Sequence, residues 1–244
     1  MGEAASGKSR FFDVILGDSK PDRGNIKLDG RLVSAGPSSV GRRATPLSVA
    51  RSHAGKEESA LVVQALTALG LWEVKEEAMS RLTPSQLIAT ELLPCFVSDS
   101  DIALIDGHLD ILDPWILESA MELIHVRAGQ GTSFLIATNH ASIAERLGNL
   151  IVWRNSEARF AGAASELVKN SQPVELLIES DDPSTIETMV APFAMEVRKA
   201  VGGLVVTAPD GQALAAKLLT QGYGSVKAVV IREISLAEAI LALY

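Results

Sequence analysis

The sequence predicts an α/β protein built around a parallel β-sheet. Two continuous apolar runs, Ile102 to Ile105 and Ser133 to Ala137, have the length of strands that are buried on both faces. A helical pattern from Pro114 to about Ala128 separates them, and this order of strand, helix and strand is typical of parallel pairing. The chain has 244 residues, of which 47% are hydrophobic and 21% charged, so it can bury a substantial core. We expect one medium domain and a smaller one.

The composition excludes several classes of protein. The net charge of -8 argues against a partner such as nucleic acid or an anionic membrane surface, and the only adjacent basic pairs are Arg42-Arg43 and Arg198-Lys199. No apolar stretch approaches the roughly 20 residues that a membrane-spanning helix needs. The single cysteine, Cys95, excludes an internal disulfide. We therefore expect a soluble protein of the cytoplasm.

The first residues match the pattern of a phosphate-binding loop, G-x-x-x-x-G-K-S/T, over Gly2 to Ser9. In such a loop, glycines and small residues such as Gly2, Ser6 and Gly7 let backbone N–H groups point at an anion on a helix N-terminus. Lys8 would neutralise the β- and γ-phosphates of a nucleotide, and the Ser9 hydroxyl would bind Mg²⁺. A short match of this kind also arises by chance, and a small polar N-terminal tag would look similar. Only Met1 stands in front of it, so the strand that normally leads into the loop is missing from the sequence.

Between this loop and the first buried strand, the pattern predicts a helix, a β-hairpin, a loop and two further helices. The predicted ranges are Arg10 to Leu16 for the helix, Asn25 to Leu28 with Arg31 to Val33 for the hairpin, Ser34 to Thr45 for the loop, and Glu57 to Leu71 and the segment after Thr83 for the two helices. The last two helices form a predicted helical insert over about residues 57–93.

Asp106 comes directly after the apolar strand that ends at Ile105. A carboxylate at this place reaches the Mg²⁺ of a nucleotide on the neighbouring phosphate loop. The alternative is a strand-ending turn made by Asp106 and Gly107. The order of a phosphate loop followed by a strand ending in Asp favours an ATPase-like sheet of the P-loop NTPase type.

After Gly162 the pattern changes to short, half-buried elements in the order strand, helix, strand, strand, helix, strand. This order is typical of a ferredoxin-like domain. The predicted elements are Val174 to Glu179, a helix from Pro183, Met195 to Arg198, Gly203 to Thr207, Gln212 to Gln221, and Val226 to Arg232. We expect residues 1–170 to form the first domain and 173–244 the second, which ends in a helix from Leu236 to Leu243.

Several motifs in register resemble the ATP-binding subunits of ABC transporters. Leu82-Thr83-Pro84-Ser85-Gln86 stands where that family has L-S-G-G-Q, and Leu87 to Pro114 is similar to its next helix, its aspartate-ending strand and its L-D-P turn. Thr138-Asn139-His140 resembles its T-H-D switch. The tail from Arg232 to Glu238 resembles the R-E-P-S-L-E-D end of ATPases that export drugs or polysaccharides.

The resemblance implies binding of ATP and Mg²⁺, with Ser9 and Asp106 as the metal ligands. In the family, two ATPase subunits sandwich the nucleotide and act with a membrane permease. It therefore implies a second ABC ATPase subunit, in a homodimer or preferably a heterodimer. It also implies a permease that holds this chain at the inner face of the cell membrane.

The residues that differ from the family stand mostly at positions where the family has its catalytic groups. Gly107 stands in place of the general-base glutamate, and Asn139 in place of the switch histidine, although His140 is one residue away. Pro84 and Ser85 replace both signature glycines. We find no glutamine loop, whereas Asp110 and Asp113 keep the aspartates of the D-loop region.

We therefore expect a hydrolysis-impaired ATP-binding subunit of an export complex, in which no residue is assigned as catalytic. Three alternatives remain open. One is an active ATPase that uses His140 and an unassigned carboxylate, and another is a scaffold that kept the fold and lost nucleotide. The third is a start that is misassigned or truncated, with upstream sequence that supplies the rest of the sheet.

Overall fold

The computed structural model describes residues 1–36, 43–55, 59–171, 174–221, 225–232 and 234–243. The chain divides into two compact units: Met1–Ala144 with Ile151–Arg159, and Glu145–Leu150 with Phe160–Tyr244. Glu57, Pro173 and Glu233 lie outside the described residues, and the predicted domain boundary between residues 170 and 173 stays a prediction. Within the described ranges, no helix has both the length and the apolar character to cross a membrane.

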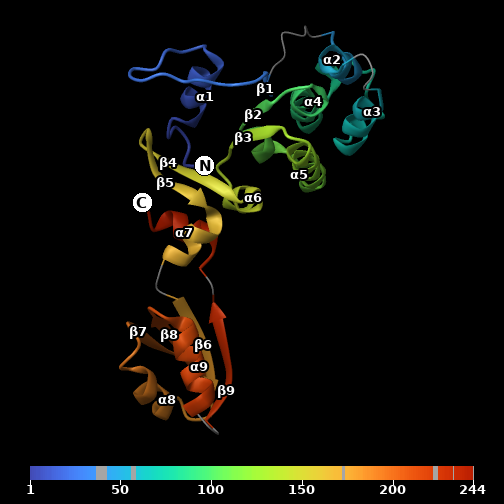
Figure 1. The fold of residues 1–244 in the computed structure, drawn as a ribbon. Helices are drawn as coiled ribbons and strands as arrows, with labels where there is room; N and C mark the ends of the chain where they lie inside the picture. Colours follow the sequence, from blue (N-terminus) through green and yellow to red (C-terminus); the bar gives the residue numbers. More distant parts are fainter. Residues whose placement is uncertain (37–42, 56–58, 172–173, 222–224, 233, 244) are drawn as a thin grey trace. The chain divides into compact units, whose positions relative to one another are not determined.

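A three-stranded parallel sheet forms the centre of the first unit (Figure 1). Its strands are β1 (Leu32–Ser34), β2 (Ile102–Asp106) and β3 (Ser133–Ala137), in that order, and β2 pairs in parallel with both neighbours. The three middle residues of β2 are buried, as its continuous apolar run predicts. Helix α5 (Pro114–Gly129) links β2 to β3. The predicted α/β fold with a parallel sheet is confirmed.

The predicted hairpin before β1 is wrong. Asn25 to Leu28 form no strand, and Leu32–Ser34 pair with β2 instead. Arg31 directs this pairing, because its N–H donates to the Asp101 carboxylate at 2.7 Å and its carbonyl accepts from the N–H of Asp101 and of Ile102. Joining a buried strand satisfies the backbone better than an isolated two-stranded hairpin, which is marginal in water.

The other helices up to Leu147 are α1 (Lys8–Leu16), α2 (Pro46–His53), α3 (Ser59–Ala68), a 3₁₀ turn (Met79–Arg81), α4 (Pro84–Val97) and α6 (Ala141–Leu147). Helices α1, α4 and α5 contact the sheet, whereas α2 and α3 contact α4. The sequence prediction missed α2, which begins with a capping box between Thr45 and Ser48. Helix α4 begins in the same way, with Thr83 accepting from the N–H of Gln86. Its second half is buried.

A two-stranded sheet of β4 (Asn149–Arg154) and β5 (Glu157–Ala163) follows α6. Its turn residues Asn155 and Ser156 both have positive φ, of 50° and 63°. The Met1 nitrogen donates to the Ile151 carbonyl at 2.6 Å, and the Trp153 N–H donates to the Met1 carbonyl at 2.8 Å. This pattern is that of a parallel pairing, and it anchors the start of the chain on β4.

The second unit contains a four-stranded antiparallel sheet with strand order β7-β8-β6-β9. The strands are β6 (Val174–Ser180), β7 (Glu196–Ala200), β8 (Gly203–Ala208) and β9 (Val226–Arg232). Helices α8 (Pro183–Val190) and α9 (Gly211–Gln221) both contribute to a core on one face of the sheet, as Figure 1 shows. Helices α7 (Ala164–Asn170) and α10 (Leu236–Leu241) complete the unit. The element order and the sheet order confirm the predicted ferredoxin-like arrangement.

Candidate functional site

The glycine-rich segment forms a loop that ends at the N-terminus of α1. Gly7 has φ 103°, a left-handed conformation that favours glycine, and no side chain caps the helix after it. The first N–H groups of an α-helix have no partner inside the helix and carry a partial positive charge. The predicted phosphate-binding loop thus lies at the N-terminus of a helix, and the binding of an anion there stays a prediction.

The hairpin of β4 and β5 supports this loop. The Ser156 N–H donates to the Ser6 carbonyl at 3.0 Å. A Cβ atom at position 2 would lie 2.2 Å from the Trp153 carbonyl oxygen, and one at position 7 would lie 3.1 Å from the Trp153 indole nitrogen. Glycine is thus required at position 2 by contact, and at position 7 by backbone conformation. The sequence alone did not identify Trp153 or Ser156, since nothing in their local pattern points to the loop.

The ammonium group of Lys8 lies among four oxygen atoms of the protein. It is 2.8 Å from the carbonyl oxygens of Gly2 and Glu3, 3.2 Å from the Ser6 hydroxyl and 3.0 Å from the Asn139 side-chain oxygen. An ammonium has three protons, so these four acceptors share them. The contact with Asn139 joins the phosphate loop to the segment after β3.

Two carboxylates act on Lys8 from the end of β2 and the turn after it. Burial lowers the pKa of Lys8, while the negative charges of Asp106 and Asp110 oppose that decrease. Asp106 lies opposite Ala137 in the register of β2 and β3. The fold thus brings the predicted phosphate-binding lysine and the predicted magnesium-binding aspartate into one electrostatic environment.

Asp110 also fixes the segment after β3. Its carboxylate accepts hydrogen bonds from the Thr138 hydroxyl and, at 2.8 Å, from the Asn139 N–H. The Thr138 oxygen in turn accepts from the His140 N–H at 3.0 Å. Thr138 is almost completely buried, with 2% of its surface exposed. Asp110 was predicted only as part of the D-loop region, and its contact with this segment emerges from the pairing of β2 with β3.

The positions predicted to lack catalytic groups lie beside these residues in the fold. Gly107 follows β2 directly, with φ 71°, and a Cβ atom built on it meets nothing within 4 Å. Asn139 and His140 are exposed, as is Ser9 in the first turn of α1. In the described part of the chain, no three or more His, Cys, Asp or Glu side chains are grouped so as to hold a metal ion.

The signature-like segment Leu82-Thr83-Pro84-Ser85-Gln86 starts α4. The Ser85 hydroxyl donates to the Asp113 carboxylate at 3.0 Å, and Asp113 caps α5 by accepting from the N–H groups of Trp115 and Ile116. Asp113 therefore caps α5, and Ser85 joins this cap to the first turn of α4.

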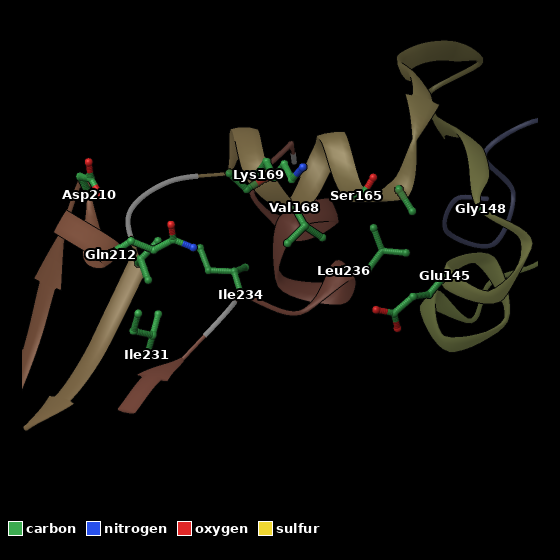
Figure 2. A pocket seen from close by; sticks show the side chains of 14 residues that line it. Glu145, Gly148, Ser165, Val168, Lys169, Asp210, Gln212, Ile231, Ile234 and Leu236 are labelled. Carbon is green, nitrogen blue, oxygen red and sulfur yellow. The ribbon is translucent and has the colours of Figure 1, made fainter. Parts of the chain in front are cut away.

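A cavity of about 710 Å³ lies in the second unit (Figure 2). Apolar side chains of Val168, Ile231, Ile234 and Leu236 line it together with polar groups such as Lys169. No residue of the phosphate loop is among those that line it. We assign the candidate site to the loop and strand ends of the first unit instead.

Comparison with known proteins supports this assignment at the level of the fold. No family model matches the chain. The phosphonates import ATP-binding protein PhnC 2 of Haloquadratum walsbyi is 23% identical over 221 residues, which are 77% of this chain and 79% of that protein. The thiamine import ATP-binding protein ThiQ of Jannaschia sp. is 26% identical over 195 residues, 71% of this chain and 85% of that protein.

A solved structure described as the ATP-binding subunit of an ABC transporter superposes with a TM-score of 0.61 at 18% identity. The superposition covers 68% of this chain and 78% of that one. The chain thus has the fold of such subunits and is similar to them in sequence. The relatives named above are import proteins, whereas the tail motif predicted the export type.

Proposed function

We propose that the chain is an ATP-binding subunit of an ABC-type transport complex that binds Mg-ATP at Gly2 to Ser9. The observation that carries this proposal is the position of Lys8. Its ammonium is held at the N-terminus of α1, next to Asn139 and within the field of Asp106. A phosphate group there would meet the ammonium together with unpaired helix N–H groups. The similarity to ATP-binding subunits supports the same assignment.

The residues present fit a magnesium ion that enters with the nucleotide. The Ser9 hydroxyl and the Asp106 carboxylate are oxygen ligands, which Mg²⁺ prefers, and phosphate oxygens and water normally complete its shell. The ion would neutralise charge on the phosphates. The protein side chains would position it.

The residues at this site predict slow hydrolysis of ATP. Gly107 has no side chain that could polarise a water molecule, and the Asn139 amide cannot accept a proton at neutral pH. We therefore propose that this subunit couples ATP binding to movement, while a second, intact ATPase subunit hydrolyses ATP and a permease carries the substrate. Such a chain would work in the cytoplasm, against the inner face of the membrane.

The direction of transport that we propose is export, because the tail from Arg232 to Glu238 resembles that of exporter ATPases. The similarity to import proteins is the argument against it. Purification of the complex from its host and sequencing of the permease tests this point. A permease of importer type would contradict export and leave the ATP-binding proposal intact.

Titration with a fluorescent ATP analogue in the presence of Mg²⁺ tests the proposed function. We expect Lys8→Ala to remove binding and Lys20→Ala, a change at an exposed lysine, to leave the dissociation constant unchanged. Unchanged affinity in Lys8→Ala would show that the loop is not the site.

A second candidate function is a scaffold that binds no nucleotide. The observation that favours it is that four protein oxygens already surround the Lys8 ammonium. If neither the wild-type chain nor Lys20→Ala bound the analogue, the scaffold would replace our proposal.

A further inference from the structure

One face of the four-stranded sheet in the second unit is covered by α8 and α9. We call the opposite face the open face, because no helix in the described part of this unit adds to this core from that side. Because side chains alternate along a strand, Leu176 and Ile178 of β6 point to the helices, and Leu177 points to the open face. Leu177 is 42% exposed, and Val230 beside it on β9 is 55% exposed. Two large apolar side chains thus lie next to each other on a surface that contacts water.

The strand register arranges the open face in three rows that cross β7, β8, β6 and β9 in that order. The first row is charged at both ends and reads Glu196, Thr207, Glu175, Arg232. The middle row is mainly apolar and reads Arg198, Val205, Leu177, Val230. The third row has small side chains except for one glutamate and reads Ala200, Gly203, Glu179, Ala228.

We propose that this open face binds the same face of a second copy of the chain, about a two-fold axis that runs along the strands. Such an axis places each row over the same row of the second copy, with the order of the strands reversed. Strand β7 then lies over β9 of the other copy, and β8 lies over β6. Sheets packed face to face keep their strands within about 30° of each other, which this arrangement allows.

The reversed rows are complementary in charge. At the two ends of the first row, Glu196 faces Arg232 of the second copy, and Arg232 faces Glu196 of the second copy. Within one copy, Glu175 accepts hydrogen bonds from Arg198 and Arg232 at 2.7 and 2.8 Å, and Arg232 also donates to Glu238. Arg198 also forms an ion pair with Glu196 at 3.6 Å, so both guanidinium groups lie beside carboxylates of the first row.

The reversed rows are also complementary in size. In the middle row Leu177 faces Val205 of the second copy, so these apolar side chains cover each other at the centre, and at the ends of the row Arg198 lies over Val230 of the second copy. In the third row Glu179 faces Gly203, which has no side chain, and Ala200 faces Ala228. The largest side chain of that row therefore meets the smallest, and no two bulky groups oppose each other. An arrangement with the axis across the strands would instead bring Glu179 against Glu175.

The size of the face predicts a weak dimer. Four strands about 4.8 Å apart, with five residues at about 3.4 Å each, cover roughly 300 Å² in projection. Two such faces bury an area at or below the lower limit of stable interfaces. We therefore expect a dissociation constant of roughly 10⁻⁵ to 10⁻³ M for the free chain.

Sedimentation equilibrium of the purified chain without nucleotide tests the proposal, over concentrations from roughly ten-fold below that range to its upper end. We expect a monomer–dimer equilibrium. Leu177→Asp should raise its dissociation constant at least about tenfold, because each dimer loses two central apolar contacts. The matched control is Leu219→Asp on α9, which changes a leucine that is 64% exposed on the helical side. It should leave the constant unchanged.

A pair of introduced charges tests the axis itself and does not depend on the apolar middle row. Because Ala200 would face Ala228 of the second copy, Ala200→Glu with Ala228→Glu should weaken the dimer, and Ala200→Glu with Ala228→Lys should bind more tightly than that variant. A chain that is monomeric at every concentration would overturn the proposal. A dimer that is insensitive to Leu177→Asp, or equal dissociation constants for the two charged double variants, would also overturn it. Omitting nucleotide separates this test from that of ATP binding.

Discussion

Replacing Asp110 with alanine removes the acceptor that holds the segment after β3. The Asp110 carboxylate accepts from the Thr138 hydroxyl and from the Asn139 N–H, which lies next to Lys8 through its side-chain oxygen. Thr138 is 2% exposed, so water does not replace the lost acceptor at its hydroxyl. Asn139 is exposed, and its N–H can bond to water instead.

The expected loss of stability follows from this difference. A buried donor left without a partner costs about 1–3 kcal/mol, and an exposed one costs close to nothing. We therefore expect Asp110→Ala to lower the free energy of unfolding of the first unit by about 2 kcal/mol. Thr138→Val removes the same hydrogen bond from the other side. The double variant should then lose about 1–2 kcal/mol less than the sum of the single variants.

Urea unfolding followed by tryptophan fluorescence measures this free energy, because all three tryptophans, Trp72, Trp115 and Trp153, belong to the first unit. Asp13→Ala, which removes an exposed carboxylate from α1, serves as the control and should stay within about 0.5 kcal/mol of wild type. If Asp110→Ala behaved like this control, or if its effect simply added to that of Thr138→Val, the proposed role of Asp110 would be refuted.

Three further predictions concern the site and the core. The double variant Gly107→Glu with Asn139→His should release phosphate from ATP faster than either single variant. The φ of 71° at residue 107 strains a glutamate there by about 1–2 kcal/mol. Equal rates for the single and double variants in a steady-state phosphate assay would contradict this prediction. Gly2→Ala should weaken binding of the ATP analogue at least about tenfold, because its Cβ would lie 2.2 Å from the Trp153 carbonyl oxygen and the loop must move; unchanged binding would show that the loop adapts freely. Burial raises the pKa of Cys95 from 9.0 to about 12, so its thiol should react with a disulfide reagent at pH 8 roughly 10³-fold more slowly than in the unfolded chain; a fast native reaction, followed by absorbance, would contradict the burial.

Much of the fold could be predicted because its strands are recognisable one at a time. The runs at Ile102 to Ile105 and Ser133 to Ala137 are almost entirely apolar, and the structure shows Ile102–Asp106 and Ser133–Ala137 as neighbouring parallel strands. In the second unit, the strand predicted over Val226 to Arg232 has the same bounds in the structure. A local pattern suffices where burial alone decides the conformation.

The prediction was wrong where a distant partner decides the conformation. The Asp29-Gly30 turn predicted a hairpin, but the residues after it pair with β2, about 70 positions later, through Arg31 and Asp101. The hairpin of β4 and β5, which carries Trp153 and supports the phosphate loop, was not predicted at all. Strand β5 has mixed polarity and is mostly exposed, so its periodicity is weak, and the short apolar run of β4 does not identify its partner.

Some residues of the candidate site could be predicted from the sequence, and others could not. Lys8 and Asp106 could be named because a spacing motif and a strand end mark them in the sequence. The link from Asp110 to Thr138 could not be named, since it depends on β2 and β3 ending side by side. The catalytic roles that Gly107 and Asn139 are predicted to lack stay predictions until hydrolysis is measured.

The four oxygens around the Lys8 ammonium would make the proposed nucleotide binding a replacement reaction. A phosphate that approaches Lys8 competes with the carbonyls of Gly2 and Glu3, and these are tethered to the lysine by the chain itself. A tethered competitor has a fixed local concentration that no dilution reduces. The free energy of binding ATP would then be the difference between the energy of the phosphate contacts and that of the internal contacts they replace. A small change in the shape of the loop would therefore alter ATP affinity without changing any atom that touches the nucleotide.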